Sequence, residues 1–385
     1  MAKRIAVIGA SIAGPTLCYW LSHYGFEPVL IERNPAPRKG GYAIDVRGEA
    51  LQVLRKMDVY PSVVDLRTRI ESVNHLNDDG VVKHVEHADD FGFREGDDVE
   101  ILRSYLVEIL LASIDKVECK YNCYATEITQ CDHFVEMHFN DGTSDRFDLV
   151  IGADGVHSST RQMIFSSNEF VKHELGVFLS VFTAANEFRL KHSANFIEKL
   201  ASNLYVESDR NPSECLIGFM FRSNRSIEDL KSRKDQVAIL EQQFQDYGWE
   251  IKRILTLLNN ADDLYFDSAA QIKMPRWSKH RVGLVGDAAY CASPLSGQGT
   301  SLALVGSYIL AGELYIAGGD FSQAFQRYHD HMQSFVAVNQ GLGAWVSEYY
   351  LLDSQQTSEQ AEARNAEIMH RINIAANAIT LPSYP

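Results

Sequence analysis

The sequence predicts an α/β fold in which a Rossmann-type domain is interlocked with a second domain built on a β-sheet. The first observation is a short apolar run, Lys3 to Ile8, followed by a glycine-containing turn and apolar residues at helical spacing from Ile12 to Tyr24. The second is that two later apolar runs end on Gly152 and Gly286. The third is the stretch 175–274, where long β-like runs surround two helical segments. Two domains also suit a chain of 385 residues.

The first βαβ unit carries a motif with a physical purpose, Gly9-Ala10-Ser11-Ile12-Ala13-Gly14, in which Ser11 replaces the middle glycine of G-x-G-x-x-G. Gly9 permits the tight strand-to-helix turn, and Gly14 lets helix and sheet approach closely. The second strand closes on Glu32, at the spacing of an acid that binds ribose hydroxyls. The motif predicts an adenine-dinucleotide site, with the pyrophosphate on free N–H groups of the helix. The alternative is a plain βαβ turn.

The remaining elements follow from periodicity and turn residues. We expect helices at residues 48–57, 101–113, 300–317, 321–338 and 359–379, and two more between Ile227 and Leu258. We expect strands near residues 28–32, 73–87 (two strands around a turn at 78–80), 118–124, 134–139, 146–151, 176–184, 214–221, 264–272 and 282–285. In the last helix the apolar stripe formed by Ile368, Ile372, Ala375 and Ile379 favours packing against the body of the protein; the alternative is a lid over a substrate cavity.

Composition narrows the class of protein. A net charge of −15, without a basic run, disfavours nucleic acid and anionic lipid as partners. Six scattered cysteines suit a reducing compartment, and no signal segment or membrane span is visible, so we expect a cytoplasmic protein. Cys119, Cys123, Cys131 and His133 do not match the spacing of zinc sites, and no metal is expected.

Two further motifs follow strand ends. The first is Asp154-Gly155-Val156-His157-Ser158-Ser159-Thr160-Arg161, and the second is Gly286-Asp287-Ala288-Ala289 with Pro294-Leu295-Ser296-Gly297-Gln298-Gly299. Taken singly, each has a simpler interpretation as a turn or a helix cap. In this order, with the first motif, they resemble the group A FAD-dependent monooxygenases, the family of para-hydroxybenzoate hydroxylase, over residues 1 to about 340.

This resemblance implies a domain division and a set of cofactor contacts. Residues 1–73, 101–170 and 281–320 would form the FAD-binding domain, 74–100 and 171–280 the substrate-binding domain, and 321–385 the C-terminal helices. The residues implied to contact FAD are Gly9, Ser11, Ala13, Gly14, Glu32, Arg33, Arg47, Arg103, Asp154, Asp287, Pro294, Gly297 and Gly299. For Arg47 an exposed surface position is the alternative. Many members of the family have histidine where this chain has Tyr290.

The resemblance also implies the chemistry. NADPH, which has no second G-x-G-x-x-G motif here, would dock transiently and reduce the flavin, and O2 would then give a flavin C4a-hydroperoxide. No catalytic side chain is expected, because the cofactor carries the chemistry. His157 and His192 have no partner that the sequence identifies.

Within this group the chain is similar to the tetracycline-inactivating monooxygenases, the tetracycline destructases. The similar stretches include Ile44-Asp45-Val46-Arg47-Gly48, Phe91-Gly92-Phe93-Arg94, Gly218-Phe219-Met220-Phe221-Arg222 and the extra C-terminal helix, which in those enzymes helps to cover the substrate. The similarity implies oxygenation of a tetracycline-like polyketide by a probable-monomer enzyme, with Phe93, Met220, Arg222 and Pro294 as candidate substrate contacts. Strand alternation places Phe221 on the other face. The alternatives are a hydroxylase of another phenolic or polyketide metabolite, and a flavin-binding protein without catalysis.

Overall fold

The computed structural model describes residues 3–37, 41–349 and 358–385. A six-stranded sheet in the order β17-β18-β11-β1-β2-β7 forms the first half of the molecule. Its strands are β17 (Ser278–Lys279), β18 (Val282–Leu284), β11 (Leu149–Gly152), β1 (Arg4–Ile8), β2 (Glu27–Ile31) and β7 (Glu118–Lys120). The pairs from β18 to β7 are parallel. This order brings the carboxyl ends of β1, β11 and β18 together, although residues 8, 152 and 284 lie far apart in the chain.

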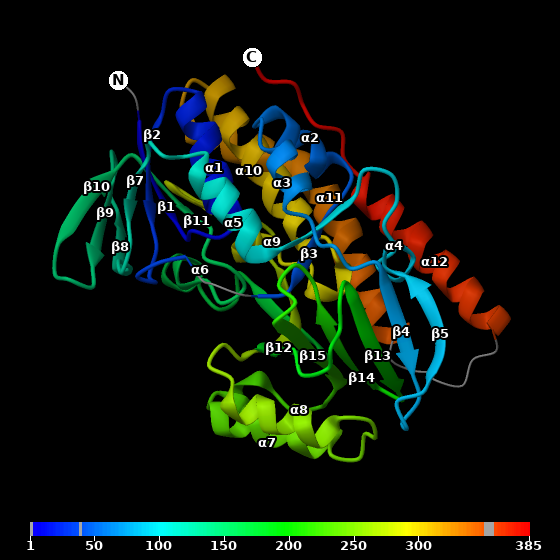
Figure 1. The fold of residues 1–385 in the computed structure, drawn as a ribbon. Helices are drawn as coiled ribbons and strands as arrows, with labels where there is room; N and C mark the ends of the chain where they lie inside the picture. Colours follow the sequence, from blue (N-terminus) through cyan, green and yellow to red (C-terminus); the bar gives the residue numbers. More distant parts are fainter. Residues whose placement is uncertain (1–2, 38–40, 350–357) are drawn as a thin grey trace.

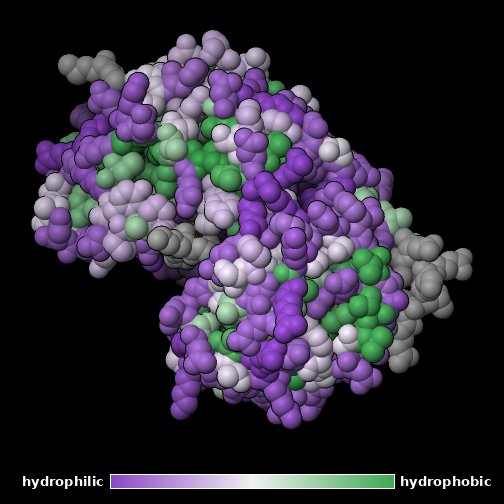
Figure 2. Space-filling view, in the orientation of Figure 1, coloured by the Kyte–Doolittle hydropathy of each residue, from purple (hydrophilic) through white to green (hydrophobic). Residues whose placement is uncertain are grey.

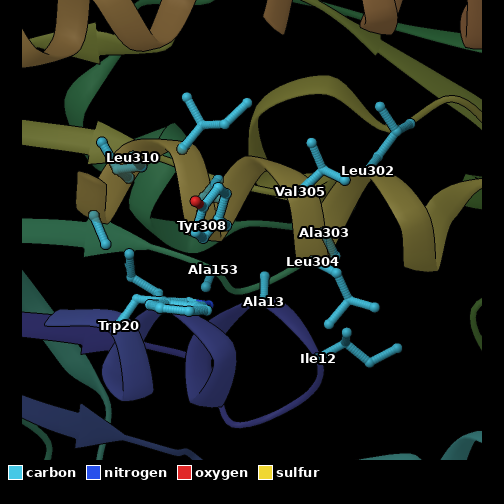
Figure 3. Close-up of a cluster of buried hydrophobic side chains, with 14 of the residues drawn as sticks. Ile12, Ala13, Trp20, Ala153, Leu302, Ala303, Leu304, Val305, Tyr308 and Leu310 are labelled. Carbon is cyan, nitrogen blue, oxygen red and sulfur yellow. The ribbon is translucent and has the colours of Figure 1, made fainter. Parts of the chain in front are cut away.

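Helices cover one face of this sheet, and a small antiparallel sheet covers the other (Figure 1). The helices on the first face include α1 (Ala13–His23), α5 (Arg103–Ala112), α10 (Gly299–Ile316) and α11 (Phe321–Tyr349). The small sheet consists of β8 (Ala125–Gln130), β9 (Val135–Phe139) and β10 (Ser144–Phe147). In Figure 3, Ile12, Ala13 and Trp20 face the α10 side chains Leu304 and Tyr308. This packing fixes the start of α1 relative to α10.

A seven-stranded sheet in the order β16-β12-β15-β14-β13-β4-β5 forms the second half. Its strands are β16 (Tyr265–Lys273), β12 (Val171–Ala185), β15 (Glu214–Arg222), β14 (Ser202–Ser208), β13 (Ser193–Lys199), β4 (Ser72–Leu76) and β5 (Val82–His87). The helices α7 (Arg233–Phe244) and α8 (Ile251–Asn260) cover its outer face, where Phe178, Phe219 and Phe221 are buried. β4 and β5 thus join strands that lie about a hundred residues later, in keeping with the interlocked domains that we expected.

The connecting elements are short. They are β3 (Ala43–Val46), β6 (Val99–Leu102), α2 (Glu49–Lys56), α3 (Tyr60–Asp65), α4 (Ala88–Phe91), α6 (Ser159–Ile164), α9 (Asp287–Tyr290), and the 3-10 turns η1 (Ile227–Leu230) and η2 (Pro294–Ser296). The last helix, α12 (Ser358–Ala376), packs Ile372 and Ala375 against Leu342 and Val346 of α11. The packing interpretation of its apolar stripe therefore holds for these residues.

Several expected elements were wrong in detail. The helix expected at 101–113 begins at Arg103, because residues 99–102 pair with β3 instead. The strand expected at 146–151 is two strands, since β10 pairs with β9 and β11 pairs with β1. β8, β13 and β14 were not expected, and α11 extends to Tyr349 rather than ending at residue 338. The α/β class with C-terminal helices is confirmed.

The surface is largely hydrophilic in Figure 2, with a hydrophobic area over the β4–β5 hairpin, where Val81, Val82 and Val85 are exposed. One helix, α10, is long and apolar enough to cross a membrane by length and composition. However, 83% of that window is buried inside the protein, as in the core helix of a folded domain.

Candidate functional site

The first glycine motif forms a tight turn between β1 and α1. Gly9 has φ +111°, and a Cβ atom there would lie 2.5 Å from the carbonyl oxygen of Ala153. A Cβ on Gly14 would lie only 1.8 Å from the carbonyl oxygen of Gly9, so α1 can start this close to β1 only with glycine. Helix α1 has no side-chain cap and no acidic residue in its first turn. Its N–H groups are therefore open to an anion.

Glu32, at the end of β2, borders the same turn. One carboxylate oxygen accepts a hydrogen bond from the backbone N–H of Ala10 at 2.9 Å, and the other accepts from the N–H of Asn34 at 2.8 Å. Each oxygen retains a second lone pair, which a ribose hydroxyl can use. The neighbouring Arg33 is exposed and donates to Ser159 Oγ at 3.3 Å.

Arg103 and Asp287 meet at this turn from two different elements. Arg103, the first residue of α5, donates from Nη2 to Ser11 Oγ at 2.7 Å. Asp287, the first residue of α9, is close enough to Arg103 for the guanidinium to lower its pKa, although burial has the larger and opposite effect and raises it. A Cβ on Gly299 would be 3.9 Å from Asp287 Oδ1. Residues from the first and third motifs and Arg103 are thus brought together.

The Asp154 motif caps α6. The carboxylate accepts hydrogen bonds from the hydroxyls of Ser158 and Ser159, and from both the N–H and the hydroxyl of Thr160. These bonds occupy the carboxylate with its own helix, which is the capping role given above as the simpler interpretation. A contact of Asp154 with FAD stays a prediction.

Arg161 links the second motif to the third, a role that we did not predict. Its side chain is buried and donates to the carbonyl oxygens of Ala288 at 2.8 Å and Val156 at 2.7 Å. Because Ala288 follows Asp287 directly, Arg161 holds α9 against the loop before α6. The sequence signal was present, since Arg161 ends the second motif, but its partner lies 127 positions later.

The loop 293–299 has alternating exposure. Ser293, Ser296 and Gln298 are buried, whereas Pro294 and Gly297 are exposed. Gly297 has φ +62°, and a Cβ there would meet no atom within 4 Å. Both amide atoms of the Gln298 side chain are buried without a hydrogen-bond partner. The loop therefore presents an open strip and holds unused polar atoms beneath it.

Arg47 is buried, so the alternative of a surface arginine is wrong. Its guanidinium is 3.0 Å from Asp45 and 3.2 Å from Asp98, and it donates to the carbonyl oxygens of Gly92 and Phe93. These contacts tie the loop 92–98 to β3. The side chain is occupied by protein, and a contact with the flavin remains a prediction.

Phe93 lies apart from the other candidate substrate contacts. It lines a cavity of about 290 Å³ between α2 and α12, together with Gly48, Met369 and Asn373. Asn373 donates to Glu95 Oε2 at 3.1 Å, which fastens α12 to the same loop. The C-terminal helix therefore forms one wall of this cavity.

Met220 and Arg222 lie on the inner face of the seven-stranded sheet, which we define as the face where Met220 packs against Leu295 of η2. Phe221 stacks on Phe178 on the outer face, at a ring-centroid distance of 5.5 Å. The predicted alternation is therefore confirmed. The Nε and Nη2 atoms of Arg222 are buried without a hydrogen-bond partner. Such atoms point to a group that the protein itself does not supply.

Three residues of β14 share the inner face and were not predicted. Asn203 pairs with Met220 across the strands, and alternation then places Tyr205 and Glu207 on the same side. Burial, with Glu100 and Asp209 nearby, raises the pKa of the Glu207 carboxyl to about 8. No local pattern identifies Glu207, because its environment comes from β6 and the following loop.

The two halves are also joined by a side-chain contact. His157 Nε2 lies 2.9 Å from Asp267 Oδ2 on β16. This pair gives His157 the partner that the sequence did not identify, and it links the second motif to the seven-stranded sheet.

The residues present fit FAD. The uncapped α1 suits a pyrophosphate, Glu32 suits a ribose, Arg103 and Asp287 offer opposite charges near the start of α10, and the strip at Pro294 and Gly297 suits a flat ring. The partnerless amide of Gln298 is a further polar group within reach of that strip.

Comparison with known proteins supports this fit. The profile of the FAD binding domain family matches residues 3–335. A flavin-dependent monooxygenase from an unknown prokaryotic organism is 46% identical over 382 residues, which cover 99% of each chain. Among solved structures, tetracycline destructase Tet(55) has a TM-score of 0.94 and 45% identity, covering 100% of this chain and 99% of its own. Tetracycline destructase Tet(51) has a TM-score of 0.92 and 42% identity, with full coverage of both chains.

Proposed function

This chain belongs to the FAD binding domain family and is an FAD-dependent monooxygenase, and on that premise we propose that it oxygenates and inactivates tetracycline antibiotics. The observation that carries the proposal is the similarity to Tet(55), which extends over the whole chain and includes the C-terminal helix. When bound, reduced FAD supplies the activation of O2 that such an oxygenation needs. The protein has to hold the cofactor, orient the substrate and exclude water.

We assign the cofactor contacts to the three motifs. Gly9, Ser11, Ala13 and Gly14 would hold the pyrophosphate at the start of α1, with Glu32 and Arg33 at the adenosine end. Arg103, Asp154 and Asp287 would lie along the chain between adenosine and flavin. Pro294, Gly297 and Gly299 would lie against the flavin ring, with Arg47 behind the adjoining loop. Arg161 positions α9, and with it Asp287, through its bond to Ala288.

The substrate would bind between the inner face of the seven-stranded sheet and the loop that contains Pro294. Met220 already packs against Leu295, so the two elements approach each other closely. The partnerless Nε and Nη2 of Arg222 suit an anionic oxygen such as the enolate of a tetracycline. Phe93 and α12 would close the opening on the other side, where α12 already forms a cavity wall.

NADPH would be the reductant and would dock transiently, since the chain has one dinucleotide motif. We further propose a monomer that works in the cytoplasm. The net charge of −15 suits a dissolved protein that avoids anionic surfaces.

The proposal is tested by following NADPH oxidation by the FAD-loaded enzyme with and without a tetracycline, and by mass spectrometry of the product. We expect tetracycline to stimulate oxidation and to gain one oxygen atom. Arg222→Gln should raise KM for tetracycline more than it lowers kcat, while Arg225→Gln, at an exposed position three residues later, should change neither. Stimulation by simple phenols but not by tetracyclines would instead identify a hydroxylase of another metabolite.

A further inference from the structure

Three side chains with metal-binding atoms lie together on the β4–β5 hairpin, apart from every residue assigned to the flavin or the substrate. His75 on β4 is directly opposite His84 on β5, and Glu86 lies two residues further along β5. Alternation places His84 and Glu86 on the same face of the strand. The hairpin thus presents two imidazoles and one carboxylate on one side of an edge strand.

The distances between these groups are short. The imidazole rings of His75 and His84 stack at a centroid distance of 3.9 Å with 15° between their planes. His75 Nε2 is 3.0 Å from Glu86 Oε2. One ligand atom from each of the three residues lies within 4.8 Å of the other two. Around a tetrahedral ion with Zn–N bonds of 2.0–2.1 Å, such atoms are about 3.3 Å apart. A small rotation of side chains closes the difference.

The surroundings hold one ligand and leave another free to adjust. The rings of Phe91 and Phe196 pack edge-on against His75, at centroid distances of 5.8 Å and 5.4 Å. The His75 side chain is 19% exposed, whereas His84 is exposed. His75 is therefore preorganised, and His84 can turn toward an ion without disturbing the core.

We propose that His75, His84 and Glu86 bind a divalent transition-metal ion, with Zn²⁺ as the ion that suits them best. Two imidazoles and one carboxylate are among the usual ligands of zinc, and the fourth position would be open to water because His84 lies at the surface. Both imidazoles are largely neutral above the usual histidine pKa of about 6.5, which is the form that binds metal. The ion would join β4 to the edge strand β5 and hold the hairpin closed.

The test uses the full-length, FAD-loaded enzyme after chelator treatment, with Zn²⁺ as the titrant in calorimetry at pH 7.5. We expect one ion per chain and a rise in the melting temperature of the enzyme when zinc is added. Loss of an outer-shell partner alone costs metal sites roughly 10–100-fold in affinity, so His84→Ala and Glu86→Gln should each weaken binding at least tenfold. His173→Ala removes another exposed strand histidine of the same sheet and should leave binding unchanged.

Two further readings keep the result unambiguous. Because all six cysteines are free and Cys119 is exposed, thiol reactivity is measured with and without zinc, and it should not change. His84 is exposed, so His84→Ala is expected to fold, whereas His75→Ala removes a half-buried ring and is not needed. Equal zinc affinity in His84→Ala and the wild type, an equal loss in His173→Ala, or protection of thiols by zinc would each overturn the proposal.

Discussion

Replacing Gly14 with alanine tests whether the approach of α1 to β1 is what makes the cofactor site. In an open helical position this change stabilises a protein by about 0.5–1 kcal/mol. Here the new Cβ would lie 1.8 Å from the carbonyl oxygen of Gly9, and a separation of at least 3.0 Å requires a shift of at least 1.2 Å. Overpacking of this kind costs about 1–3 kcal/mol, which outweighs the gain in helix propensity.

The same shift moves the N–H groups of α1 away from the pyrophosphate. A hydrogen bond to a charged group contributes about 1.5–3 kcal/mol, so we expect FAD to bind roughly 10–100-fold more weakly. The measurements are the Kd from flavin fluorescence on the apoenzyme, and the free energy of unfolding.

The matched control is Gly341→Ala in α11, at an exposed position where a Cβ meets no atom within 4 Å. It should leave the Kd unchanged and increase stability slightly. If Gly14→Ala binds FAD as tightly as the wild type, or if both variants weaken binding equally, the reasoning from close approach is wrong.

The other predictions concern single contacts. Asp287→Ala should lose FAD affinity, which absorbance of the purified protein at flavin wavelengths would report; full retention of flavin would refute the assigned role. Glu32→Ala should weaken FAD binding by about 1–3 kcal/mol, because it removes the ribose contact and the anchor of the Ala10 N–H; an unchanged Kd would contradict this. Glu207→Gln should stabilise the protein increasingly from pH 5 to pH 8, by up to a few kcal/mol. The sign follows because the pKa is raised from 4.5 to about 8, so only the unfolded chain loses the proton in this range and wild-type stability falls as pH rises. Equal pH profiles of unfolding for wild type and Glu207→Gln would refute that assignment.

Much of the cofactor region could be predicted because its signals are local. Gly9 and Gly14 lie in one turn, and their conformations follow from that turn. The alternation on β15 also follows from the strand alone, which is why Met220 and Phe221 were placed on opposite faces correctly.

The missed features depend on partners far away in the chain. Arg161 bonds Ala288, His157 bonds Asp267, and the guanidinium of Arg47 is taken by the loop at Gly92. None of these pairs is encoded by spacing. The strands β13 and β14 were missed for a related reason, because each has buried residues on both faces and lacks clean alternation.

The account depends most directly on one measurement, the mass of the product formed from a tetracycline by the FAD-loaded enzyme with NADPH and O2. Addition of one oxygen atom, with NADPH oxidation that depends on the tetracycline, is the predicted result. An unmodified tetracycline together with unstimulated NADPH oxidation would contradict the proposed substrate.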